Sequence, residues 1–102
     1  MYIARFSYDV LPVDRGQAME FIRRELDEAR EAGLSARLLV PFTRGPDCPA
    51  LQFEIELRSL DQLDRFRHQG AGERADETGD WMHAFSRILR SPPVVEVLRV
   101  HN

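Results

Sequence analysis

Apolar and polar side chains alternate along four segments of the chain, and this period of two predicts four β-strands. The pattern is cleanest in LQFEIELR, where every second residue from Leu51 to Leu57 is a large apolar one. In the opening segment YIARFSYDV, the same spacing places Phe6 and Tyr8 on one face of a strand. A sheet built from these strands has one apolar side, which needs a cover of helices. The predicted strands are 2–10, 36–42, 51–58 and 94–100.

The first predicted helix lies between strands 2–10 and 36–42. Asp14 is placed to cap its amino terminus, and Gln17 follows three residues later as the return partner of a capping box. Gly33 suits the left-handed residue that commonly follows a helix. Apolar side chains recur at helical spacing and form one stripe that can cover the sheet. The residues of this stripe are Ala18, Met19, Ile22, Leu26 and Ala29.

A second helical region follows strand 51–58, and a loop interrupts it. The sequence Ser-Leu-Asp-Gln at 59–62 fits a capping box, which opens a short helix that runs to about Gln69. Residues 70–79 combine three glycines with several acidic residues, so they are predicted to form a loop. Helical spacing resumes over 81–90 and ends where two consecutive prolines remove backbone donors.

The order of these elements, β-α-β-β-α-β, predicts an α+β fold of the ferredoxin-like type. Right-handed crossovers place both helical regions on the same face of a four-stranded antiparallel sheet. A chain of 102 residues corresponds to one ordinary domain, so residues 1–102 are expected to fold as a single unit.

The face of the sheet that the helices leave open is expected to be polar. If the first strand lies beside the third, Arg5 faces Glu54 or Glu56 across a strand pair. Two interpretations remain: a solvated polar face, or a homodimer in which two such faces close into a barrel around a charged interior. The residues of this face are Arg5, Ser7, Arg37, Leu39, Gln52, Glu54 and Glu56. The apolar residues that a second copy would cover are Ile3, Leu39 and either Val95 with Val97 or Leu98 with Val100.

Charge and composition exclude several classes of function. The formal net charge is −3, and the chain has neither a basic cluster for nucleic acid nor a polybasic segment for an anionic membrane. All 14 basic residues are arginine, which excludes Schiff-base chemistry and favours the hypothesis of a GC-rich bacterial gene. The single cysteine, Cys48, has no internal disulfide partner, and the opening residues do not form a secretion signal, so a reducing cytoplasm is the expected location.

Taken together, the opening strand YIARFSYDV, the capped helix that ends at Gly33, the segment LQFEIELRSLDQLDRFR and the ending WMHAFSRILRSPPVVEVLRV resemble the dimeric α/β-barrel superfamily. This superfamily includes NIPSNAP-like proteins and the antibiotic-biosynthesis-monooxygenase group. The resemblance covers nearly the whole chain, and none of its segments is a catalytic signature. It implies a homodimer with a pocket in each subunit between helices and sheet.

The haem-degrading branch of this superfamily uses an asparagine on the first strand with a tryptophan and a histidine from the helical region. The only asparagine here is Asn102. Trp81 and His83 are two residues apart, about 200° around a helix. Because Trp81 belongs to the apolar arc, His83 is expected to point to solvent. The sequence therefore disfavours haem degradation.

Four residues are candidates for a ligand site: Tyr8, Phe66, Trp81 and Arg37. Aromatic rings on the helix-facing side can line an apolar pocket, although ordinary core packing explains the same spacing. Tyr8 is also the candidate catalytic group, because its hydroxyl lies at the end of a strand and needs a partner if it is buried. Arg37 is a candidate for orienting a polar ligand group, and a cross-strand ion pair is the alternative.

No cofactor or metal is expected, because the chain has no phosphate-binding glycine loop and its three histidines lack metal-ligand spacing. The leading hypothesis is a small-molecule-binding protein for a hydrophobic or aromatic metabolite. A cofactor-free enzyme, monooxygenase-like or isomerase-like, is one form of it. The alternative is a non-catalytic dimerisation or interaction module. The sequence identifies neither the ligand nor a reaction.

Overall fold

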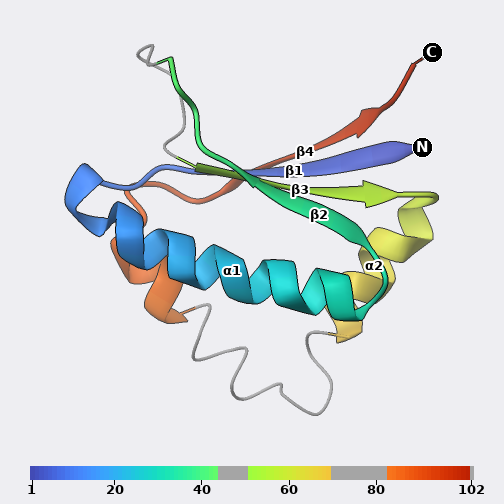
Figure 1. The fold of residues 1–102 in the computed structure, drawn as a ribbon, viewed down its shortest axis with the longest axis horizontal. Helices are drawn as coiled ribbons and strands as arrows, with labels where there is room; N and C mark the ends of the chain where they lie inside the picture. Colours follow the sequence, from blue (N-terminus) through green and yellow to red (C-terminus); the bar gives the residue numbers. More distant parts are fainter. Residues whose placement is uncertain (44–50, 70–82, 102) are drawn as a thin grey trace.

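A computed structural model describes residues 1–43, 51–69 and 83–101, with the side chains of 65–69 left out. It contains a four-stranded sheet with helices on one side and a bare opposite face (Figure 1). A short turn of 3-10 helix, Pro12–Asp14, precedes the first helix. Residues 83–88 are also helical. The strands and helices are β1 (Tyr2–Tyr8), α1 (Arg15–Glu31), β2 (Ser35–Leu39), β3 (Leu51–Leu57), α2 (Leu60–Gln69) and β4 (Val94–Arg99).

The sheet has the strand order β2-β3-β1-β4, and all three neighbouring pairs are antiparallel. The central strand β1 lies between β3 and β4, so that Arg5 is directly opposite Glu54 on one side and Glu96 on the other. This confirms the predicted α+β ferredoxin-like arrangement. The predicted loop 70–79 lies outside the described residues.

The core forms where the apolar face of β3 meets the apolar stripe of α1. All four apolar side chains of β3 are buried, and the rings of Phe53 and Phe6 pack with centroids 5.8 Å apart. From α1, Ala18 and Ile22 are fully buried against the sheet. Aliphatic and aromatic burial of this extent contributes about 1.5–3 kcal/mol for each large side chain.

The ends of α1 match the sequence analysis only in part. Gly33 adopts φ = +78°, as expected for the residue after the helix. The prediction that Asp14 caps the amino terminus is wrong, because Asp14 makes no side-chain capping hydrogen bond. Pro12–Asp14 already forms a helical turn, and Asp14 itself has helical torsion angles. A capping side chain works from an extended residue, and Asp14 is not extended.

The capping box predicted at the start of α2 is displaced by one residue. The Gln62 side chain accepts a hydrogen bond from the backbone N–H of Arg58, rather than from that of Ser59. The backbone N–H of Gln62 in turn donates to the carbonyl of Ser59 at 3.2 Å. The helix therefore begins where it was predicted to begin, with a different donor satisfied.

Strand β2 is shorter than the predicted 36–42. It ends at Leu39, because Pro41 has no N–H for the ladder and restricts the residue before it. As a result, Val40 and Phe42, which the predicted strand included, lie outside the sheet and are exposed, Phe42 fully.

The bare face of the sheet, called the open face here, carries one row of charges across four strands. The Arg5 Nε donates to Glu54 Oε1 at 2.7 Å, and the Arg37 Nε and Nη2 donate to Glu54 Oε2 at 2.9 and 2.8 Å. Both carboxylate oxygens are thus covered, and the Glu54 side chain is only 2% exposed. The predicted pairing of Arg5 with Glu54 is confirmed.

Strand β4 has apolar side chains exposed on both of its faces. Val95 and Val97 share the helix side with Phe6 and Ala4, whereas Leu98 shares the open face with Ile3. Val97 and Leu98 are 45% and 37% exposed. The sequence analysis left open which of the two pairs, Val95 with Val97 or Leu98 with Val100, lies on the open face. The register assigns that face to Leu98.

The buried face of β3 gives a stability prediction. Phe53→Ala removes a fully buried ring and is expected to lower the free energy of unfolding by about 3–5 kcal/mol, because a cavity remains. Phe42→Ala is the matched control, since Phe42 is fully exposed, and is expected to change it by no more than about 0.5 kcal/mol. Urea denaturation followed by circular dichroism measures both. Equal effects of the two substitutions would contradict the assigned core.

Candidate functional site

The candidate site is a pair of side chains, Tyr8 of β1 and Glu25 of α1, that meet between the sheet and the helices. The Tyr8 hydroxyl lies 3.2 Å from Oε2 and 3.4 Å from Oε1 of Glu25, so it donates to the carboxylate. Tyr8 is buried, and Glu25 as a whole residue is half-buried. The expectation that a buried Tyr8 hydroxyl has a partner is confirmed.

Two phenylalanine rings continue the aromatic packing from Tyr8. The Phe85 ring centroid lies 4.9 Å from that of Tyr8 and 5.0 Å from that of Phe21, which gives tilted and edge-on contacts. The bridge between Val10 and Leu89 fixes the helical residues 83–88 beside the end of β1. The Tyr8–Glu25 pair is therefore an isolated polar contact in an aromatic environment.

This environment shifts both acids toward their neutral forms. Burial, which disfavours the charged carboxylate, raises the pKa of Glu25 to about 7. The hydrogen bond from Tyr8 opposes this shift, and the negative charge of Glu28 adds to it. The pKa of Tyr8 rises far above its usual value because of burial, the nearby charge of Glu25 and their hydrogen bond. Tyr8 therefore keeps its proton, and Glu25 exchanges one near neutral pH.

The second buried carboxylate, Glu54, behaves in the opposite way. Burial acts to raise its pKa, but the hydrogen bonds and positive charges of Arg37 and Arg5 outweigh burial and lower it. Among the described residues, no ion pair reaches Glu25 in this manner. Glu54 is thus a fixed structural charge, and Glu25 is a titrating one.

Glu25 was not among the candidates from the sequence, although its position contained a usable signal. It follows Ala18 by seven residues and precedes Ala29 by four, so it lies in the middle of the buried stripe of α1. A carboxylate in the centre of an apolar helical stripe must find a partner or shift its pKa. A stripe defined only by its apolar residues does not include Glu25.

The other three candidates do not join Tyr8 in the described part of the structure. Arg37 lies on the open face, where it pairs with Glu54 and is separated from Tyr8 by the sheet. Trp81 lies outside the described residues, and so does the side chain of Phe66 in α2. His83 is exposed, as expected, and its ring lies 3.3 Å from the guanidinium of Arg87.

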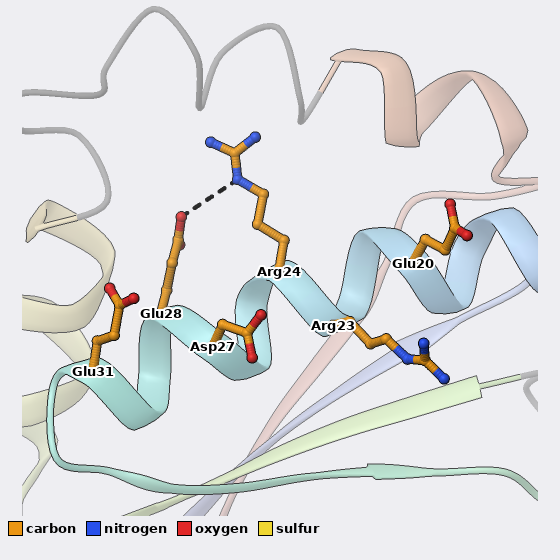
Figure 2. A pocket seen from close by; sticks show the side chains of 6 residues that line it. All are labelled: Glu20, Arg23, Arg24, Asp27, Glu28 and Glu31. Carbon is orange, nitrogen blue, oxygen red and sulfur yellow. Dashed lines mark ion pairs between the residues drawn. The ribbon is translucent and has the colours of Figure 1, made fainter.

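Two hollows lie elsewhere on the surface. One, of about 440 Å³, runs along the outer side of α1, where charged side chains surround the ion pair of Arg24 with Glu28 at 3.5 Å (Figure 2). The other, of about 560 Å³, lies where the end of α1 meets the start of β2 and the end of β3, beside Arg58 and Gln62. The first hollow is lined by charged side chains alone, and the second by a mixture of polar and apolar residues that includes the buried Leu57; neither lining contains Tyr8 or Glu25.

The described residues contain no cluster of three or more His, Cys, Asp or Glu side chains placed to hold a metal ion. Within the same ranges, no helix is both long and apolar enough to cross a membrane.

The sequence matches no protein-family model and no curated protein. Solved structures with the same fold exist. A NIPSNAP family protein from Agrobacterium tumefaciens superposes with a TM-score of 0.75 at 16% identity, covering 99% of this chain and 93% of its own. An antibiotic biosynthesis monooxygenase superposes with a TM-score of 0.69 at 15% identity over 100% of both chains. A putative antibiotic biosynthesis monooxygenase from Nitrosomonas europaea gives 0.63 at 13% identity, over 98% of each chain.

Sheet order, helix placement and these superpositions define the class: a ferredoxin-like α+β domain. More particularly, the fold is the one found in the solved structures of a NIPSNAP family protein and of antibiotic biosynthesis monooxygenases. The resemblance stated from the sequence is confirmed at the level of the fold. At 13–16% identity, the likeness extends to the fold and carries no residue roles.

The raised pKa of Glu25 predicts a pH dependence of stability. The unfolded chain releases this proton near pH 4.5, whereas the folded protein holds it until about pH 7. The stabilising contribution is therefore complete below pH 4.5 and is lost as pH rises through 7. Relative to Glu25→Gln, which does not titrate, the protein is expected to lose roughly 1–3 kcal/mol across this interval.

Urea denaturation of both proteins at steps between pH 4 and 8 measures this difference, because all other titrating groups cancel in the comparison. Stability curves that stay parallel would show that Glu25 titrates normally.

Proposed function

We propose that this protein binds a small hydrophobic or aromatic metabolite between its sheet and its helices, beside Tyr8 and Glu25. The observation that carries the proposal is the Tyr8–Glu25 pair itself, together with the aromatic packing of Tyr8, Phe85 and Phe21. Ligand sites in proteins combine mostly apolar walls with a few placed polar groups, and this layer has both. The exposed helix-side residues of β4, Val95 and Val97, extend the apolar surface next to Phe6.

Three of the residues singled out from the sequence enter this proposal. Tyr8 supplies the hydroxyl and remains the candidate catalytic group, while Trp81 and Phe66 are proposed as further aromatic walls. Arg37 is not part of this proposed ligand site. It lies on the open face, where it pairs with Glu54.

The proposal includes a homodimer that pairs through the open face. In the row formed by Arg37, Glu54 and Arg5, one carboxylate pairs with two guanidinium groups, which leaves a net charge of one. Removing this row from water therefore costs less free energy than burying three unpaired charges. The half-buried Ile3 and the exposed Leu98 flank this row, and a second copy would bury them further. Two such faces would close a barrel around a charged interior. The proposed location is the cytoplasm, where the lone Cys48 stays reduced.

Catalysis without a cofactor, monooxygenase-like or isomerase-like, is the enzymatic form of this proposal. Solved structures of the same fold carry the name antibiotic biosynthesis monooxygenase, which is compatible with that form. Any chemistry would depend on the reactivity of the substrate and on the proton that Glu25 exchanges. The second candidate function, a module that only self-associates, is supported by the exposed apolar residues of the open face.

Ligand binding is tested with naphthalene as the probe. One molecule is expected to bind per chain, and Phe85→Leu is expected to weaken binding severalfold, because the ring contacts to Tyr8 and Phe21 are lost. Phe42→Leu, the same substitution at a fully exposed position, is expected to leave binding unchanged. Fluorescence titration measures the dissociation constants. Failure of naphthalene to bind would favour the self-associating module.

Self-association is tested with two neighbouring substitutions on β4. Leu98→Glu places a charge on the open face and is expected to weaken dimerisation at least tenfold, since an unpaired charge would be buried. Val97→Glu places the same charge on the helix side of the same strand and is expected to leave the dimer intact. Size-exclusion chromatography with light scattering distinguishes dimer from monomer. A monomeric parent protein at micromolar concentration would refute the proposed pairing.

A further inference from the structure

We propose that the Glu25 carboxyl, held by Tyr8, donates a hydrogen bond to an oxygen of the ligand, so that the site selects neutral carbonyl or hydroxyl compounds and rejects carboxylates. This inference rests on the proposed function, because it names the chemical class of ligand for the same site.

The two oxygens of the Glu25 carboxyl have different roles in the proposed contact. The Tyr8 hydroxyl is close to both carboxylate oxygens, so it donates to one of them and leaves the other for a second partner. Tyr8 is buried, whereas Glu25 as a whole residue is half-buried, so a ligand would reach the pair from the side of Glu25 rather than from that of Tyr8. A protonated carboxyl accepts through its carbonyl oxygen and donates through its hydroxyl. When Tyr8 donates to the carbonyl oxygen of the protonated carboxyl, the O–H of Glu25 is left to donate to a ligand.

The charges around Glu25 determine which ligands fit. From β1, the facing group is the neutral Tyr8, and from the helical residues 83–88 the ring of Phe85 closes the other side of Tyr8. From α1 itself, Glu28 adds a negative charge, although it is paired with Arg24. On residues 83–88, His83 and Arg87 are exposed and contact one another. No cation of the described residues pairs with Glu25, so within this part of the chain no positive charge balances an anionic ligand at the carboxyl.

Protonation of Glu25 therefore controls binding. In the protonated form, the site offers a donor to a ligand oxygen within an apolar layer. In the ionised form, the donor is gone and the carboxylate repels any acceptor oxygen. The pKa near 7 makes both forms available close to neutral pH. A ligand that binds only the protonated form should lose affinity in proportion to the ionised fraction.

The test compares three probes of the same ring system: acetylnaphthalene, which is a neutral ketone, naphthoate, which is a carboxylate, and naphthalene. With a pKa of about 7, the affinity for acetylnaphthalene is expected to be roughly thirtyfold higher at pH 5.5 than at pH 8.5. Naphthalene is expected to bind with little pH dependence, and naphthoate at least tenfold more weakly than acetylnaphthalene at pH 5.5. Fluorescence titration measures all three.

Two variants separate the role of Glu25 from a general effect of pH. Glu25→Gln keeps an N–H donor that never ionises, so acetylnaphthalene is expected to bind it equally well at both pH values. Glu28→Gln is the control on the same helix, and its pH dependence is expected to persist with a slightly lower midpoint, because one negative charge is removed. Carbon-13 NMR titration of the Glu25 carboxyl in the parent protein gives a readout that needs neither variant nor probe.

The outcomes distinguish failure of this inference from failure of the proposed function. Naphthalene binding together with a pH-independent affinity for acetylnaphthalene, or with tighter binding of naphthoate, would overturn this inference and leave the proposed function standing. A Glu25 carboxyl that titrates near 4.5 would also overturn it. Failure of all three probes would overturn the proposed function and this inference together.

Discussion

The structure depends on the alternation of side chains along β1, the central strand of the sheet. Because successive residues project to opposite faces, Tyr8 and Arg5, three positions apart, belong to two different environments. Tyr8 enters the layer between sheet and helices and meets Glu25. Arg5 enters the open face and meets Glu54. A shift of register by one residue would exchange these environments and remove both contacts at once.

The two carboxylates show how partners, more than burial, decide the state of an acid in this protein. Glu54 is almost completely buried, yet two guanidinium groups keep it ionised at neutral pH. Glu25 is less buried, but in the described part of the chain its hydrogen-bond partner is a phenol, and the negative charge of Glu28 raises its pKa further. The arginines that hold Glu54 are therefore structural members of the open face. The absence of a comparable cation beside Glu25, within the described residues, leaves its proton free to respond to a ligand.

The sequence predicted the order of elements, the buried face of β3 and the pairing of Arg5 with Glu54, because these follow from periods of two and 3.6 residues. It mispredicted the cap at Asp14, since the helical turn before α1 depends on the local torsion angles at Pro12–Asp14. It also extended β2 past Pro41. The candidate site was half predicted: Tyr8 followed from its place on β1, whereas Glu25 required treating a charged residue as part of an apolar stripe.

Strand β4 has apolar side chains on both faces, which raises the question of what specifies its pairing register. Its valines and leucine would satisfy either side, so hydrophobicity alone specifies its register weakly. Glu96 breaks this degeneracy, because the observed alignment places it opposite Arg5 on the charged side. Sliding the strand by one position would carry that carboxylate into the aromatic layer, without a guanidinium to meet it. The charge of Glu96 thus favours the observed alignment of this edge strand over a slip by one residue.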